Sequence, residues 1–448
     1  MKPPSSLRGL ASRVLYPNTT PAAQATRARA DEGGPSNPAS PPDADGGIYL
    51  GWGTAGPVRA RAEHHALVVG PPRSGKTSRI VTPTVVRHQG PAVITSTKAD
   101  ILHATVASRS RLGVCWYWDP SGTTTLPDTL PGSVEAVSWS PVSGCDTWDE
   151  TVTRCRTLAR AARPDLRGVE RHWVERAENL LAPLIHAAAL SGSDMAVVLS
   201  WLHRRVLDHP LSILEDRGAK RAADIIYGIA QTDPRELSGI FSTADSLLAA
   251  YRSDAALQAT RRPSFDPEAF AESTDTLYLV APALTQQLHA PIVVCLLEQI
   301  RTATYKRHPR PPMLFALDEV ANIAPIPDLD SVLAEGGSQG LIVLACLQDL
   351  SQARARWDKA ADGFLTLFTH KLVLPGIADT VTLKAISTLA GEIDVPVMST
   401  NTTNTLIRHS TVTRSTRRQA RLPADQIASG PPGTAILISG TNLARVAV

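Results

Sequence analysis

The stretch from His65 to Thr77 constrains the fold of this chain more than any other. A short apolar run leads directly into Gly-Pro-Pro-Arg-Ser-Gly-Lys-Thr at residues 70–77, which fits the pattern G-x-x-x-x-G-K-T. Glycines let such a loop curl tightly, so that consecutive backbone NH groups and the following helix N-terminus face an anion. A buried strand that enters a phosphate-binding loop and then a helix is therefore predicted. The alternative is a glycine-containing surface turn.

The same stretch predicts how a nucleotide would be held. Lys76 can reach the β- and γ-phosphates, and the Thr77 hydroxyl can bind Mg²⁺. The predicted cofactors are ATP and Mg²⁺. The predicted binding residues of the loop are Gly70, Pro71, Pro72, Arg73, Ser74, Gly75, Lys76, Thr77 and Ser78.

Length and composition set broad limits. A chain of 448 residues is long enough for two or more domains, and a formal net charge of +3 is too small to indicate a nucleic-acid partner by itself. The five cysteines are scattered without a C-x-x-C pair, so we expect them to pack as small apolar groups in a reducing cytoplasm. No run approaches the roughly 18 to 20 apolar residues that span a bilayer. We expect a cytoplasmic protein that would reach the plasma membrane only through a partner.

The order of predicted elements indicates an α/β fold with an insertion. Residues 1–46 are rich in Pro, Ala, Ser and Gly and are predicted to be disordered. Apolar runs then alternate with helical periodicity, which favours a parallel sheet covered by helices. The predicted strands are 47–52, 65–69, 90–95, 112–119, 276–280, 313–319, 340–348, 371–374 and 434–438, with helices at 77–88 and 292–307. Helical periodicity dominates between them, so the predicted domains are 47–145 with 258–448, and an all-α insertion at 146–257.

A second apolar run, from Met313 to Glu319, ends in two carboxylates. Asp318 can hold the Mg²⁺ that Thr77 also contacts, and Glu319 can orient and polarise the attacking water. We expect the strands that carry Lys76 and Asp318 to be neighbours in the sheet. Gln348, at the end of the next predicted strand, is a candidate to contact the γ-phosphate or the water. The alternatives are a solvated strand exit for the carboxylates and a plain strand-end amide for Gln348.

The order and spacing of these motifs resemble those of the type IV coupling proteins, the hexameric RecA-like ATPases of conjugation and type IV secretion. The resemblance rests on seven short segments: 70–77, Ile94 to Lys98, Trp139-Ser-Pro141, His172-Trp173, Thr276 to Pro282, Leu314 to Asn322, and Gly336 to Leu341 with Leu347-Gln348. It implies a RecA-like P-loop NTPase core with a mainly parallel sheet and an inserted all-α domain. It also implies DNA-stimulated ATP hydrolysis with Lys76, Glu319 and Gln348 as catalytic residues, and Thr77 and Asp318 as metal ligands.

The same resemblance implies partners. They are DNA, carried as a single strand by a relaxase complex, the relaxosome proteins, the components of a type IV channel, and further copies of the chain in a hexamer. Three departures from the family stand in the sequence. Members typically carry N-terminal membrane helices, which this sequence lacks. Ser96-Thr97 replaces an Asp-Pro pair, so that only Lys98 carries over, as a phosphate-side or structural contact. The loop after the carboxylate strand also lacks a trans-acting arginine, for which Arg354 and Arg356 are weaker substitutes.

Two questions stay open at this point. The segment from Leu406 to Leu422 has arginines at 408, 414, 417, 418 and 421 and no acidic residue, which suits DNA phosphates, a subunit interface or plain solvated surface equally. The function also has two alternatives. One is a soluble DNA translocase of chromosome segregation or repair, and the other is a recruitment platform that binds ATP without hydrolysing it.

Overall fold

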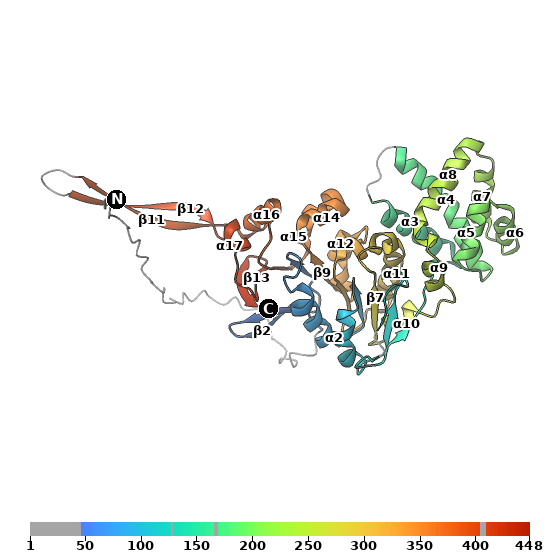
Figure 1. Cartoon of the computed structure of the whole chain (residues 1–448). Coiled ribbons are helices and arrows are strands. Elements are labelled where there is room, and N and C mark those ends of the chain that lie inside the picture. Colours follow the sequence, from blue (N-terminus) through green and yellow to red (C-terminus); the bar gives the residue numbers. More distant parts are fainter. Residues whose placement is uncertain (1–45, 127–128, 165–168, 404–408) are drawn as a thin grey trace, which may run out of the picture. The chain divides into compact units, whose positions relative to one another are not determined.

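The computed structural model describes residues 46–126, 129–164, 169–403 and 409–448 (Figure 1). Residues 1–45 of the segment predicted to be disordered, and Arg408, lie outside the described residues. The described residues form a mixed sheet with the strand order β2-β1-β14-β13-β10-β3-β9-β8-β4-β7-β5-β6. The run from β10 to β6 is parallel, and β13, β14, β1 and β2 extend it in antiparallel fashion. The predicted α/β class with a mainly parallel sheet is confirmed.

The strands lie close to the apolar runs that predicted them. Their bounds are β1 Tyr49–Gly53, β2 Gly56–Arg59, β3 Ala66–Val69, β4 Ala92–Ser96, β5 Cys115–Trp118, β6 Glu135–Ala136, β7 Thr276–Val280, β8 Met313–Leu317, β9 Leu341–Leu347, β10 His370–Val373, β13 Thr434–Ser439 and β14 Asn442–Ala447. One prediction about their order is wrong. β3 and β8 are not neighbours, because β9 lies between them and pairs with both.

Alternation along the buried strands divides the core into two layers. In β3, Leu67 and Val69 face one cluster of buried side chains, and Ala66 and Val68 face the other. The first cluster continues without interruption into the helices that follow residue 146. All five cysteines are buried and free, as their scattered positions predicted. Burial of both faces is the expected state of a parallel sheet with helices on each side.

The helices around the sheet connect successive strands. They are η1 Lys76–Val81, α1 Thr82–Arg87, α2 Asp100–Arg109, α10 Pro267–Ala271, α11 Gln286–Arg307, α12 Val320–Ile323, α13 Leu329–Glu335, η3 Gly336–Gln339, α14 Leu350–Trp357, η4 Asp358–Gly363, α15 Phe364–Leu367, α16 Thr380–Ala390 and α17 Ala424–Ala428. The helix after the phosphate loop begins as a π-helix and continues as an α-helix, and Pro83 falls in the first turn of α1, where its missing NH is tolerated. Helix α11 begins six residues before the prediction, with Pro291 inside it.

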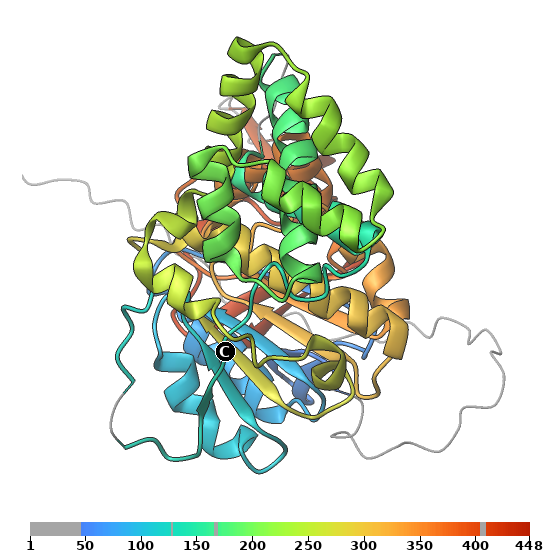
Figure 2. The same cartoon turned by 90° about the vertical axis from the view of Figure 1, so that its right-hand side faces the viewer.

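A group of helices occupies the sequence between β6 and β7. Its members are α3 Trp148–Ala162, α4 Val169–Leu190, α5 Met195–Arg204, α6 Asp208–Asp216, α7 Lys220–Ala230, α8 Pro234–Leu247, η2 Ala249–Arg252 and α9 Asp254–Ala259. Helix α4 is the central element, and α3, α5, α6, α7 and α8 all pack against it (Figure 2). Trp139, which precedes the group, links it to the sheet domain. Its backbone NH donates to the Ala259 carbonyl of α9 at 3.3 Å, and its indole NH donates to Gln299 of α11 at 2.7 Å.

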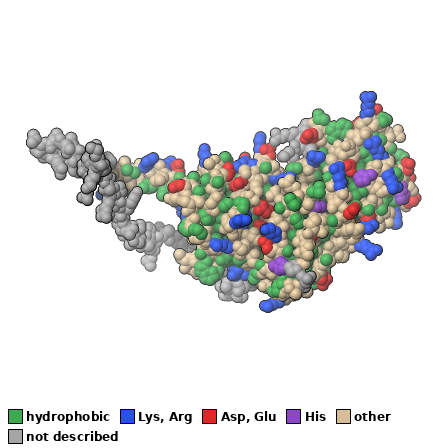
Figure 3. All heavy atoms as spheres, viewed as in Figure 1, with side chains coloured by type: hydrophobic (Ala, Val, Ile, Leu, Met, Phe, Trp, Pro, Cys, Tyr) green, Lys and Arg blue, Asp and Glu red, His purple; other side chains and the backbone are tan. Residues whose placement is uncertain are grey.

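A separate two-stranded sheet was not predicted. Strands β11 (Glu392–Thr403) and β12 (His409–Ala420) pair with each other in antiparallel register and with no other described strand (Figure 1). Basic and acidic side chains are interspersed over the face of the molecule in Figure 3, in keeping with the small net charge. In the described part of the chain, no helix has the length and apolar character that a bilayer span requires.

Candidate nucleotide-binding site

The phosphate loop is built by close backbone contacts at the end of β3. The Gly70 NH donates to the Leu347 carbonyl of β9 at 3.1 Å, which fixes the start of the loop against the neighbouring strand. A Cβ at residue 70 would lie only 2.7 Å from Leu374 Cβ, so only glycine fits. Gly75 ends the loop with φ of 94°, a left-handed conformation that glycine adopts without strain. The sequence pattern therefore produces the tight curl that an anion site needs.

Lys76 is held inside this curl. Its side chain is buried, and Nζ donates to the Gly70 carbonyl at 2.6 Å and the Pro71 carbonyl at 3.0 Å. An ammonium group has three donors, so one remains for a phosphate oxygen. The Ser74 hydroxyl is buried and has no hydrogen-bond partner among the described residues. Both groups fit an anionic ligand seated in the loop.

Thr77 and Asp318 meet although their strands are not neighbours. The Thr77 hydroxyl donates to Asp318 Oδ2 at 2.8 Å, across the end of the intervening strand β9. The pKa of the Asp318 carboxyl is raised to about 6, chiefly by burial and also by the charge of Glu319, while the hydrogen bond from Thr77 and the charge of Lys76 lower it. A hydroxyl and a buried carboxylate at this distance are oxygen ligands of the kind that Mg²⁺ prefers in nucleotide sites. The pair fits a divalent ion beside the loop.

Glu319 follows immediately in an unusual backbone conformation. Its φ is 57° and ψ 46°, which places a non-glycine residue in the left-handed region directly before α12. Its carboxylate accepts hydrogen bonds at 3.5 Å from the Gln348 side chain and from Asn322. Strained backbone of this kind costs about 1–3 kcal/mol and is found at functional sites. Gln348 therefore lies beside Glu319, and Asn322 is a second contact that the sequence did not predict.

These groups line a cavity of about 550 Å³. It contains the loop from Pro72 to Ser78, the end of β4, the first turn of α2, and both carboxylates. Lys98 lines it with an exposed side chain. Gly70, Pro71 and Gln348 do not line it. The carbonyls of Gly70 and Pro71 instead accept hydrogen bonds from Lys76. Four lining residues from α1 and α2 are not among the predicted binding residues: Thr82, Asp100, Ile101 and Ala104. Asp100 and Ala104 have the i, i+4 spacing of one helix face after the predicted strand.

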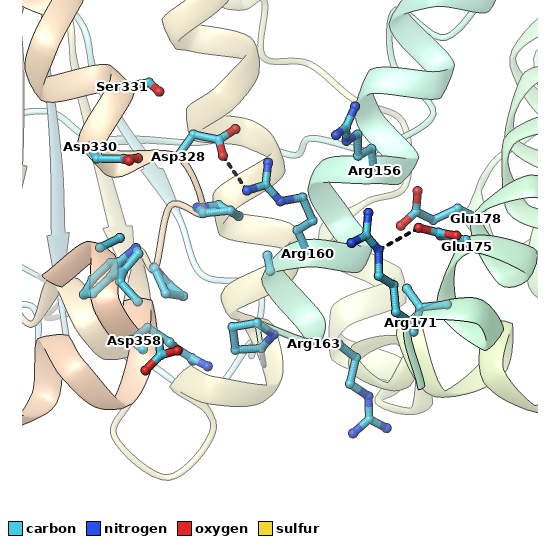
Figure 4. Close-up of a pocket in the computed structure, with 18 of the residues that line it drawn as sticks. Arg156, Arg160, Arg163, Arg171, Glu175, Glu178, Asp328, Asp330, Ser331 and Asp358 are labelled. Atoms are coloured by element: carbon cyan, nitrogen blue, oxygen red, sulfur yellow. Dashed lines mark hydrogen bonds and ion pairs between the residues drawn. The ribbon is translucent and has the colours of Figure 1, made fainter. Parts of the chain in front are cut away.

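A larger cavity of about 730 Å³ has a different character (Figure 4). It lies between α3 with α4 and the segments around Asp328 and Asp358, and none of the predicted nucleotide-binding residues lines it. Its arginines face carboxylates: Arg160 pairs with Asp328 at 2.5 Å, and Arg171 pairs with Glu175 at 2.8 Å. Among the described residues that line it there is no glycine loop to present backbone NH groups. The smaller cavity is therefore the candidate nucleotide site on chemical grounds.

The two arginines considered as trans-acting substitutes have partners within the chain. Arg354 pairs with Asp379 at 3.4 Å, and Nε of Arg356 donates to the Ala321 carbonyl at 3.1 Å. Both lie on α14, directly after Gln348. Their contacts stabilise the packing of α14 against α12 and the start of α16, which favours the structural interpretation of these two residues.

Comparison with known proteins agrees with this geometry. Residues 30–442 match the model of the family described as Type IV secretory system Conjugative DNA transfer. The chain belongs to this family. It is 22% identical over 354 residues to the conjugal transfer protein TraG of Escherichia coli, an alignment that covers 69% of this chain and 53% of TraG. The chain thus spans about half the length of the curated relatives it matches.

Solved structures extend the agreement to the fold. The unbound bacterial conjugative coupling protein TrwB superposes with a TM-score of 0.67 at 18% identity, over 89% of this chain and 88% of TrwB. TrwB in complex with ADP and Mg²⁺ gives a TM-score of 0.65 at 19% identity, with the same coverage. The resemblance inferred from the sequence motifs is confirmed by the family match, and the RecA-like fold by these structures.

Proposed function

We propose that this chain is an ATP-hydrolysing coupling protein that delivers DNA to a conjugative type IV secretion channel. The observation that carries the proposal is the 2.8 Å contact between Thr77 and Asp318, which joins the phosphate loop to the carboxylate strand in one cavity. Family membership supplies the link to DNA transfer. The nucleotide site alone would not identify a DNA-transfer ATPase, because phosphate loops occur in many enzyme classes.

The residues of the cavity divide the work of nucleotide binding. The loop NH groups and Lys76 would bind the phosphates, with Ser78 and Lys98 at the cavity wall. Thr77 and Asp318 would hold Mg²⁺. The structure of TrwB, which has the same fold, in complex with ADP and Mg²⁺ supports this proposal. When bound, the metal neutralises charge that develops on the phosphate oxygens during transfer. We therefore assign ATP and Mg²⁺ as the cofactors.

Hydrolysis needs a group that handles the attacking water. Glu319 is the best placed, because its carboxylate lines the cavity beside Asp318 and is held from the other side by Gln348 and Asn322. In this role Glu319 accepts a hydrogen bond from the water and takes up its proton as the water attacks. Gln348 orients Glu319 and reports the state of the nucleotide to the helix α14 that follows it.

Assembly and partners follow from the family. A RecA-like core in this family is expected to work as a hexameric ring at the cytoplasmic face of the membrane, moving DNA that a relaxase complex presents as a single strand. Residues 146–257 would form the domain that meets relaxosome proteins and channel components, and residues 47–145 with 258–448 the nucleotide-binding domain. The continuous buried cluster that links α3 and α4 with the sheet gives partner binding a physical route to the ATPase core.

A recruitment platform that binds ATP without hydrolysing it is the main competing function. The two proposals differ in turnover, so we would measure ATP hydrolysis with and without single- and double-stranded DNA. The wild-type chain should hydrolyse ATP faster with DNA, Lys76→Ala should lose nucleotide binding, and Glu319→Gln should bind ATP but not turn it over. Lys220→Ala removes an exposed lysine of α7 and serves as the matched control. A wild-type chain that binds ATP without turnover would refute the proposal.

A further inference from the structure

The ribbon formed by β11 and β12 has no covering layer. Its strands pair over twelve positions, from Glu392 opposite Ala420 to Thr403 opposite His409, which gives a length of about 40 Å. The described side chains of both strands are exposed or half-buried, and β12 touches the rest of the chain mainly through α16. An isolated two-stranded ribbon is marginally stable in water. A ligand that lies along an uncovered ribbon of this kind would stabilise it.

Glu392 and Asp394 lie at the start of β11, and beyond them the charge of the ribbon is one-sided. The sequence carries no acidic residue between Asp394 and Asp425, and all the ionic charge of that interval comes from arginine. Alternation along β12 places Arg414 and Arg418 on one face and Arg417 on the other. Arg418 pairs with Glu392 at 3.4 Å.

Two of these arginines are available to a ligand. Within the described part of the chain, Arg414 and Arg417 make neither an ion pair nor a hydrogen bond, and both are exposed. Their cross-strand neighbours are Met398 and Val395, whose side chains have no carboxylate to pair with a guanidinium. A guanidinium without a carboxylate partner loses no existing contact when it binds a phosphate. The ribbon thus presents one unpaired cation on each face.

We propose that β11–β12 is a DNA-binding arm that contacts the phosphodiester backbone of duplex DNA through Arg414 and Arg417. The major groove of a duplex, about 12 Å wide, admits a two-stranded ribbon, and the long arginine side chains of β12 can then reach phosphates along the adjacent groove wall. Residues 392–420 contain no Phe, Trp or Tyr, so the ribbon lacks the stacking platform that single strands require. The proposal rests on the proposed function, in which DNA is the cargo.

A neighbouring subunit is the competing occupant. Ile393, Val397 and Met398 are exposed at 46%, 37% and 63%, which would suit a protein surface. Pro396 lies among them in β11, however, and its missing NH opposes the addition of a further strand along this edge. Beyond Asp394 the ribbon has no acidic residue, and this part suits a polyanion better than a protein surface of mixed charge. Duplex DNA is therefore the favoured ligand.

The test is the salt dependence of DNA binding by the full chain. Fluorescence anisotropy would use a labelled duplex longer than one helical turn, about 34 Å, and a single strand of the same length. Each phosphate contact contributes roughly 0.9 to the slope of log K against log salt concentration. Arg414→Ala with Arg417→Ala should lower that slope by about two on the duplex, and weaken binding at low salt at least about tenfold. Arg414→Lys with Arg417→Lys keeps the charge and should restore the slope.

Several outcomes would overturn the proposal. One is that the wild-type chain binds the duplex and the double alanine variant binds it with the same affinity and the same salt slope. That result would leave the proposed function intact. A second is a variant that fails to assemble into rings although each copy binds DNA normally, because the ribbon would then be a subunit arm. A third is a wild-type chain that hydrolyses ATP but binds no duplex, which removes the DNA ligand itself. The double variant is expected to keep its urea midpoint, since both arginines are exposed.

Discussion

Replacing Asp318 by Asn is expected to make the folded protein more stable at neutral pH while removing a metal ligand. Burial raises the pKa of Asp318 from 3.8 to about 6, and each pKa unit corresponds to 1.36 kcal/mol. The ionised carboxylate therefore destabilises the folded state by up to about 3 kcal/mol above pH 6. Asn carries no charge and keeps an oxygen that can accept from Thr77 at the position of the 2.8 Å contact.

The pH dependence of this effect has a definite sign. Because the folded-state pKa lies above the unfolded value, the folded protein holds the proton of Asp318 more tightly than the unfolded chain does. The stabilisation that this proton brings is complete below about pH 3.8 and is lost as the pH rises through about 6. The free energies of unfolding of the wild-type chain and of Asp318→Asn should differ little below about pH 3.8, and by up to about 3 kcal/mol above about pH 6.

Urea unfolding followed by tryptophan fluorescence would measure the difference at pH values on both sides of this window. Asp425→Asn, at an exposed position of α17, is the matched control and should change the free energy of unfolding by no more than about 0.5 kcal/mol. Mg²⁺ with ATP should then raise the stability of the wild-type chain but not of Asp318→Asn, because a ligand stabilises only a state that binds it. An Asp318→Asn variant that is less stable than wild type at neutral pH would refute the reasoning.

Two further predictions concern the scaffold. Arg109→Ala should lower the free energy of unfolding in urea by about 3–5 kcal/mol. The fully buried guanidinium donates to the carbonyls of His88, Gly90 and Thr274, and these carbonyls would lose their donor. Arg111→Ala, at an exposed position, is the control, and equal urea midpoints for the two variants would contradict the structural role of Arg109. Gly70→Ala should weaken ATP binding and lower the free energy of unfolding by about 1–3 kcal/mol, because the new Cβ would lie 2.7 Å from that of Leu374. Gly228→Ala, in open space on α7, is the control and should leave the stability unchanged or raise it. An ATP affinity of Gly70→Ala equal to that of the wild type would contradict the packing argument.

Much of the sheet was predictable because its strands are buried on both faces. A run such as Met313 to Leu317 has no polar residue, so its sequence alone identifies a strand and places Asp318 at the end. The order of strands was not predictable in the same way. Local sequence does not say that β9, which comes later in the chain than β8, inserts between β8 and β3. The contact between Thr77 and Asp318 forms because both side chains reach over the end of β9.

The elements that the sequence missed are those without a buried face. β14 exposes most of its side chains and does not alternate, whereas β11 alternates only from Ile393 to Val397 around Pro396, a residue that argues against a strand. The arginine segment around Arg414 was recognised by its charge, but its pairing with residues 392–403 depends on a register that no local pattern reveals. The contact of Asn322 with Glu319 was not predictable from local sequence either, because it depends on the left-handed backbone at residue 319.

The measurement that tests the central claim most directly is ATP-dependent displacement of streptavidin from the biotinylated end of a single-stranded DNA, with the full chain, Mg²⁺ and ATP. The account predicts displacement by the wild-type chain and none by Glu319→Gln, which should still bind ATP at the Thr77 and Asp318 site. Steady ATP hydrolysis by the wild-type chain on the same single strand without any displacement of the streptavidin would contradict it.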